Sequence, residues 1–131
     1  MNARELINEA CDQINTYRHP NIDDAAELLD KILTAAGLGS LKHDQIESIS
    51  EYGGDINIET SWSARGCAQT SSYKFPASFL DLADPIKAAT VWGLQKQIND
   101  TRIERDRYAT YAKTYGEKLV VLEAELTRAQ Q

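Results

Sequence analysis

Hydrophobic residues recur every three or four positions through the last third of the chain. From Val91 onward this rhythm continues for about five heptads, interrupted by only two residues that are neither apolar nor aromatic, Thr101 and Arg105. Asp84 and Pro85 are typical of a helix start. We therefore predict one long helix over residues 84–131. The predicted oligomer interface along its seam consists of Val91, Leu94, Ile98, Arg105, Tyr108, Ala112, Tyr115, Leu119, Leu122 and Leu126.

A helix of that length needs a partner. It would be roughly 65 Å long, whereas a small domain is only about 30 Å across. In a parallel dimer Arg105 would face its own copy inside the seam, two like charges in a partly dry environment. We therefore predict an antiparallel homodimer in which Arg105 meets Tyr108 of the other chain and Leu94 meets Leu119.

The same stretch allows a second arrangement. Asn99 and Asp100 are good turn residues, and Thr101–Glu104 match a helix capping box. The chain could therefore turn at Asn99–Asp100 and fold back as an intramolecular helical hairpin. We favour the continuous helix because the three-four rhythm passes through this point without a slip.

Two shorter amphipathic segments occupy the N-terminal third. Apolar residues at helical spacing predict one helix over about residues 3–17 and a second over about 23–36. Asn21 and Asp23 are the capping candidates of the second helix, and Gly37 is its expected stop. Neither helix is long enough to be stable alone, so we predict that they form a hairpin packed against further structure.

The middle of the chain changes to a period of two. Alternating apolar and polar residues predict strands at about 46–52, 55–63 and 69–75. Gly53–Gly54 is the signature of a two-residue hairpin loop, and Ala64–Cys67 is a second turn. The predicted fold class is thus α+β and mainly helical, with an N-terminal helical hairpin, a three-stranded antiparallel meander and a long C-terminal coiled-coil helix.

We divide the predicted fold into a small α+β head over residues 1–83 and an oligomerisation helix over 84–131. Within the meander we expect Trp62 and Phe75 to face inward, since aromatic residues at strand spacing usually pack in a core. Arg65 at the tip of the second turn and Tyr73 on the following strand are the expected contacts with a partner.

Charge is spread unevenly along the chain. The formal net charge is −6, but residues 1–60 contain 12 Asp and Glu against 4 Lys and Arg, a net of −8. Residues 61–131 contain 8 against 10, a net of +2. An acidic half disfavours nucleic-acid binding and suits a basic protein partner. The predicted acidic contacts are Asp23, Asp24, Glu27 and Asp30.

No pattern for catalysis, metal or cofactor is found. Cys11, His19, His43 and Cys67 lack the spacing of a zinc site, and neither a glycine-rich phosphate loop nor a nucleophile motif is present. We expect no enzyme, no metal and no cofactor. No apolar run approaches the ~20 residues that span a bilayer, so we expect a cytoplasmic protein without a membrane segment.

An alternative ligand site lies in the middle of the predicted long helix. Guanidinium groups suit phosphate and tyrosine rings suit a base, so the segment could bind a small anion or a nucleotide within a helical dimer. Neighbouring Glu104 and Asp106 would screen such an anion. The residues of this alternative are Arg102, Arg105, Arg107, Tyr108 and Tyr111.

The favoured function is a non-catalytic protein-binding module that occupies a partner through its acidic head or its hairpin turn. A short, acidic, motif-free chain with a helical arm is similar in overall character to small accessory proteins encoded by phages, although no residue motif carries that likeness. It would imply an inhibitor of a host protein. A small-anion binder and a purely structural oligomer are the alternatives.

Overall fold

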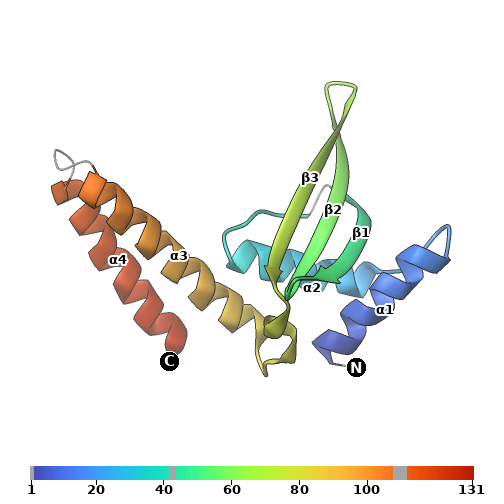
Figure 1. The fold of residues 1–131 in the computed structure, drawn as a ribbon, viewed down its shortest axis with the longest axis horizontal. Coiled ribbons are helices and arrows are strands. Elements are labelled where there is room, and N and C mark those ends of the chain that lie inside the picture. Colours follow the sequence, from blue (N-terminus) through green and yellow to red (C-terminus); the bar gives the residue numbers. More distant parts are fainter. Residues whose placement is uncertain (1, 42–43, 108–111) are drawn as a thin grey trace.

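The computed structural model describes residues 2–41, 44–107 and 112–131 and confirms an α+β, mainly helical fold (Figure 1). The two N-terminal helices and the three strands lie within a few residues of their predicted bounds. The elements are α1 (Ala3–Thr16), α2 (Asp23–Ala35), β1 (Gln45–Tyr52), β2 (Asp55–Ala64), β3 (Cys67–Pro76), the 3-10 helix η1 (Ala77–Asp81), α3 (Pro85–Arg107) and α4 (Ala112–Gln130).

The strands form the predicted antiparallel meander in the order β1-β2-β3. Both connections are two-residue loops, and both loop residues have positive φ: 64° and 83° at Gly53 and Gly54, 53° and 78° at Arg65 and Gly66. This is the type I′ turn, whose twist matches that of the flanking strands. Arg65 is the only non-glycine residue among the described ones that adopts positive φ.

One core lies between the sheet and the helices. In β1 the register shifts between Ile46 and Ser48, so Glu47 is an extra residue that lets Ile46 and Ile49 lie on the same inward face. The first turns of α3 close the core, which therefore crosses the predicted boundary at residue 84. Its buried members are Ile7, Ala10, Ala25, Leu29, Ile32, Leu33, Ala36, Leu41, Ile49, Ile56, Ile58, Phe75, Ala77, Phe79, Leu80 and Ala89.

Helix caps follow the sequence in two cases of three. Asn2 accepts a hydrogen bond from the backbone N–H of Glu5 at 2.8 Å, and Asp84 accepts one from Lys87 at 3.0 Å. The prediction for α2 is wrong, because its N-cap is Ile22, which makes no side-chain capping bond, and Asp23 is already helical. Acidic residues in that first turn still favour the positive end of the helix dipole.

Helix α3 crosses the C-terminal end of α2 at very short range. A Cβ atom placed on Gly93 would lie 2.6 Å from the carbonyl oxygen of Ala36. Directly after Ala36, Gly37 adopts a φ of 74° and turns the chain away from the helix axis, as predicted for the end of α2. Only glycine at position 93 lets the two backbones approach so closely.

The prediction of one continuous C-terminal helix is wrong. Helix α3 ends at Arg107, α4 begins at Ala112, and the two pack antiparallel (Figure 1). Arg102 and Glu123 form an ion pair at 2.9 Å, whereas a continuous helix would separate them by roughly 30 Å. The predicted seam is filled from within one chain. Its buried residues are Leu94, Ile98, Leu119 and Leu122, with Leu126 and Ala129 packed against them.

The alternative prediction of a helical hairpin is correct in kind but wrong in place. Asn99–Asp100 lies inside α3, and the buried hydroxyl of Thr101 donates to the carbonyl oxygen of Gln97 at 2.7 Å instead of capping a new helix. Tyr108, the predicted partner of Arg105, lies outside the described residues. Because the seam is occupied internally, it no longer argues for a homodimer, which stays a prediction.

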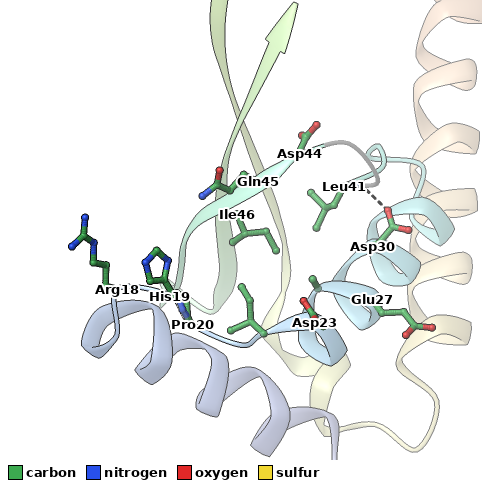
Figure 2. Close-up of a pocket in the computed structure, with 12 residues that line it drawn as sticks. Arg18, His19, Pro20, Asp23, Glu27, Asp30, Leu41, Asp44, Gln45 and Ile46 are labelled. Atoms are coloured by element: carbon green, nitrogen blue, oxygen red, sulfur yellow. Dashed lines mark hydrogen bonds between the residues drawn. The ribbon is translucent and has the colours of Figure 1, made fainter.

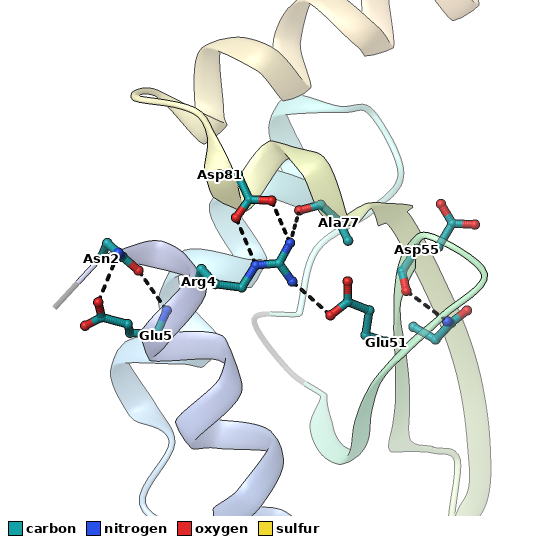
Figure 3. Close-up of polar contacts among 8 residues, drawn as sticks. Asn2, Arg4, Glu5, Glu51, Asp55, Ala77 and Asp81 are labelled. Carbon is teal, nitrogen blue, oxygen red and sulfur yellow. Dashed lines mark hydrogen bonds and ion pairs between the residues drawn. The ribbon is translucent and has the colours of Figure 1, made fainter.

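Arg4 links three elements at the end of the sheet where β1 and β3 finish (Figure 3). Its Nε and Nη2 donate to the two carboxylate oxygens of Asp81 at 3.0 and 2.8 Å, Nη1 donates to Glu51 at 2.9 Å, and Nη2 donates to the carbonyl oxygen of Ala77 at 3.2 Å. Helix α1 is thereby tied to the end of β1 and to η1. The hydrogen bonds from Arg4 lower the pKa of Asp81 below its ordinary value of 3.8.

The two helical glycines make a matched pair for testing the crossing. Gly93→Ala is expected to lower the free energy of unfolding by about 1–3 kcal/mol, because the added methyl meets backbone that cannot rotate away. Gly116→Ala in α4 meets nothing within 4 Å and should raise it by about 0.5–1 kcal/mol through helix propensity. Urea denaturation of both variants measures this, and a stabilised Gly93→Ala would contradict the close crossing.

The Arg4 contacts predict a dependence of stability on acid pH. Because the pKa of Asp81 is lower in the folded state, its contribution is complete above the unfolded value of about 4 and is lost as pH falls below it. Asp81→Asn should therefore lose stability at pH 7 and show a flatter decline below about pH 4. Thermal melts across pH at low salt test this, with Asp100→Asn on α3 as the control. Parallel pH profiles for wild type and Asp81→Asn would contradict it.

Candidate functional site

Strands β2 and β3 extend well beyond β1 and project from the body as a two-stranded arm (Figure 1). The last pair formed by β1 joins Gln45 to Ser61, and from there the β2–β3 ladder continues alone to the turn. We call residues 62–70 the arm. All of them are exposed except Ala64, which is half-buried.

The arm keeps its shape without a core of its own. Its ladder is complete from Trp62–Gln69 to Ala64–Cys67, and its type I′ turn favours the strand twist. The indole Nε1 of Trp62 donates to Ser71 Oγ at 3.0 Å across the two strands. These contacts present the arm as a regular hairpin with both faces open to solvent.

The expectation that Trp62 and Phe75 both belong to the core is half right. Phe75 is 1% exposed and stacks near Phe79, but Trp62 is 37% exposed. Side-chain alternation places both on the face toward the helices. Trp62 lies past the last residue pair of β1, and the described residues leave more than a third of its surface exposed.

A groove opens where the arm leaves the body (Figure 2). It has a volume of about 520 Å³ and lies between α2, the link from α1 to α2, and the start of β1. Its floor is apolar and its walls are charged. It is lined by Arg18, His19, Pro20, Ile22, Asp23, Ala26, Glu27, Asp30, Leu41, Asp44, Gln45 and Ile46.

The carboxylates of this groove differ in their contacts. Asp30 accepts hydrogen bonds from the backbone N–H of Leu41 at 2.7 Å and from Ser40 at 2.9 Å, so it holds the loop after α2 (Figure 2). Asp44 accepts from the buried hydroxyl of Thr60 at 3.0 Å. Exposed Asp23 instead has no hydrogen bond or ion pair within the described part of the chain.

The groove therefore gathers three of the four predicted acidic contacts, Asp23, Glu27 and Asp30. Glu27 also pairs with Lys31 at 3.0 Å on the exposed surface of α2, an arrangement that contributes little. Asp24 points elsewhere and lines a separate cavity between α1 and α2.

The groove lies next to the base of the arm. Gln45 and Asp44, at the rim of the groove, contact the two residues of β2 that directly precede the arm, Ser61 by pairing and Thr60 by a hydrogen bond. Because side chains alternate, Trp62 shares a face of the sheet with Thr60. Its indole leans toward Ser71 on β3, to which its Nε1 donates.

The structure separates the two predicted contacts of the meander. Arg65 is at the exposed tip of the arm, whereas Tyr73 pairs with Ile58 at the level of the core and is half-buried. The Tyr73 ring lies over Gly39, where an added Cβ would come within 2.9 Å of it. Tyr73 is mainly a packing residue.

The arginines of the alternative ligand site lie near the end of α3. Arg102 pairs with Glu123 at 2.9 Å, and Arg105 contacts Asp106 at 3.4 Å. Arg105 is not buried in the seam: its side chain is 39% exposed, and its contact with Asp106 lies at the surface. Tyr108 and Tyr111 lie outside the described residues, so the predicted arginine–tyrosine cluster is not assembled from described positions.

The cysteines and histidines are dispersed. Cys11 and Cys67 are free thiols, the first half-buried in α1 and the second exposed at the arm tip. Burial raises the pKa of Cys11, which keeps the thiol protonated at neutral pH. His43 lies outside the described residues. Within residues 2–41, 44–107 and 112–131, no group of three or more His, Cys, Asp or Glu could hold a metal, and no helix is long and apolar enough to cross a bilayer.

The sequence pattern identifies only three of the twelve residues that line the groove, Asp23, Glu27 and Asp30. It assigns no role to Arg18, Leu41 or Asp44, and it offers His19 only as a zinc-ligand candidate. Loop residues contribute to a site through the path of the backbone, which periodicity does not report. Only the acidic run in α2 carried a signal.

Comparison with family models, curated proteins and solved structures finds no match to this chain.

The two aromatics of the sheet give a test of where the core ends. Phe75→Ala should lower the free energy of unfolding by about 3–5 kcal/mol, as expected for a fully buried ring. Trp62→Ala should lower it by about 1 kcal/mol or less, because the indole lies on the arm. Urea melts followed by far-UV circular dichroism measure both. Equal losses would place Trp62 in the core after all.

Proposed function

We propose that this chain is a non-catalytic protein-binding module that holds a basic segment of a partner between the acidic groove and the arm. The observation that carries the proposal is the arm itself, a regular hairpin that extends past the third strand with nearly every residue exposed. A structure of this kind contributes no buried core to its own fold.

The chemistry of the surface defines the partner. The groove combines an apolar floor with carboxylates on α2 and at the start of β1, opposed by Arg18 and His19 in the link between helices. Trp62 adds a partly exposed amphipathic ring at the base of the arm. Exposed tryptophan beside charged groups is the composition of binding hot spots. A basic segment that also carries apolar side chains satisfies both parts of the groove.

Electrostatic attraction would act mainly on the rate of association with the partner. Surface carboxylates raise association rates with basic partners and are screened by salt within about 10 Å at 0.1 M. The association rate constant should therefore fall as salt increases. The dissociation rate constant should depend mainly on the contacts made by Trp62 and the apolar floor.

The proposal is tested by site-specific photo-crosslinking in extracts of the source organism. A benzophenone amino acid replaces Ser63 on the arm or Gln45 at the groove rim, and a matched control carries it at Val120 on α4, which is 69% exposed. We expect the first two positions to capture the same protein and Val120 not to capture it. Capture of one protein from all three positions, or of different proteins from Ser63 and Gln45, would contradict a single binding surface.

Two variants then measure the contributions with the captured partner. Replacing Ser63–Ala68 by Asn-Gly moves the turn two residues down each strand, which preserves the alternation of hydrogen-bonded pairs and keeps Trp62 paired with Gln69. This shortened arm and the double variant Asp23→Asn, Glu27→Gln should each weaken binding at least about tenfold, a free-energy loss of about 1.4 kcal/mol. Unchanged affinity in both, with folded proteins, would refute the proposal.

A further inference from the structure

The outer edge of β3 exposes a row of unpaired backbone groups. Ala77 N–H donates to the carbonyl oxygen of Gly54 at 2.9 Å, which marks that pair as hydrogen-bonded. Hydrogen-bonded pairs alternate in an antiparallel ladder, so Tyr73 and Phe75 bond toward β2. The N–H and C=O groups of Ala68, Thr70, Ser72 and Lys74 consequently point outward, on the edge that faces α3 (Figure 1).

These outward groups have no backbone partner among the described residues. Ser72 and Lys74 are also exposed, so the described part of the chain leaves these two positions of the row open to solvent. An open edge is a template for another extended strand, and peptide recognition by strand addition uses such edges.

The space beside this edge is large enough for a strand. A cavity of about 560 Å³ separates β3 from α3. Trp92 and Lys96 of α3 form its far wall, with the Lys96 ammonium 5.4 Å from the centre of the Trp92 ring. The lining residues are Leu38, Asp55, Ser72, Tyr73, Lys74, Phe75, Pro76, Trp92 and Lys96.

The charges around the edge select an acidic occupant. Lys74 lies on the edge, Lys96 faces it from α3, and Arg65 is at the arm tip. Two carboxylates oppose them: Asp55, half-buried at the base, and Glu59 of β2, which is exposed opposite Ser72 on the same face as Lys74. This basic edge disfavours pairing with a second copy of itself, because lysines on an edge strand repel their own kind. It favours an extended segment that carries Asp or Glu.

We propose that the β3 edge binds an extended acidic peptide as a fourth strand between β3 and α3. Side chains of the added strand alternate between two faces. One set lies on the face of Tyr73 and meets Trp92 and Leu38, so it is apolar. The other set lies on the face of Lys74, so it is acidic. The preferred sequence therefore alternates acidic and apolar residues.

This site is independent of the acidic groove. The groove lies at β1, and β1 and β3 are opposite edges of the sheet. The two sites also have opposite charge, so a partner segment that suits one is repelled by the other. Failure of either proposal leaves the other unaffected.

The test uses a fluorescent peptide of alternating Glu and Val, titrated against the full chain and followed by anisotropy. The same peptide with Lys in place of Glu should bind at least about tenfold more weakly. Two further peptides carry N-methyl groups on all Glu or on all Val residues. In antiparallel addition the Glu N–H groups bond to β3, and in parallel addition the Val N–H groups do.

One methylated peptide should therefore bind as the parent does, and the other about tenfold or more weakly. Parent-like binding by both, or equal loss by both, would overturn the proposal, as would no binding of the parent peptide. The methylated pair decides the mode of binding without any change to the protein.

Protein variants provide a second measurement. Ser72→Pro removes an outward N–H at a position where an edge strand tolerates proline, and Ser72→Ala retains it. Only the proline variant should lose affinity, by about tenfold. Lys74→Glu should also lose it, whereas Lys118→Glu on α4 should not. If only the groove variant Asp23→Asn, Glu27→Gln weakens binding of the peptide, the peptide occupies the groove and the proposal is wrong. If the chain forms dimers that Ser72→Pro abolishes, the edge pairs with a second copy of the chain and the proposal is also wrong.

Discussion

The close passage of α3 over the end of α2 determines where the rest of the molecule lies. Gly93 sits against the carbonyl of Ala36, and the left-handed turn at Gly37 then carries the chain toward the sheet. Below the crossing, Ala89 completes the main core. Beyond it, α3 leaves the body and carries α4. A side chain at position 93 would push α3 away from α2. The packing of the core, the position of the helical hairpin and the distance between α3 and the β3 edge therefore all depend on glycine at this position.

The helical hairpin explains why the same heptad pattern also fits a dimer. An antiparallel seam needs Leu94 and Ile98 opposite Leu119 and Leu122, whether the second helix comes from another chain or from the same one. Within one chain the second helix is always nearby, so pairing costs far less entropy than association does. The repeat identifies the buried face of each helix but not the chain that supplies its partner.

What the sequence predicts correctly depends on local chemistry. The strands follow from alternation, the first turn from Gly53–Gly54, and the end of α2 from Gly37, because each is decided by a few neighbouring residues. The end of α3 is not marked, since Tyr108–Tyr111 contains neither glycine nor proline. The exposure of Trp62 depends on where the helical layer stops, and the groove depends on the path of a loop. Both are properties of the assembled fold.

The sheet is built for more than stability. Ordering a residue costs about 1–2 kcal/mol of backbone entropy, which an isolated two-stranded ladder scarcely offsets, and the arm buries no core in return. A turn placed at the end of β1 would retain every buried side chain of the sheet. The extra length instead brings Trp62 and Arg65 away from the body and extends the open β3 edge. An arm without buried side chains adds little to the stability of the isolated chain, so its length is the feature on which the proposed binding function rests.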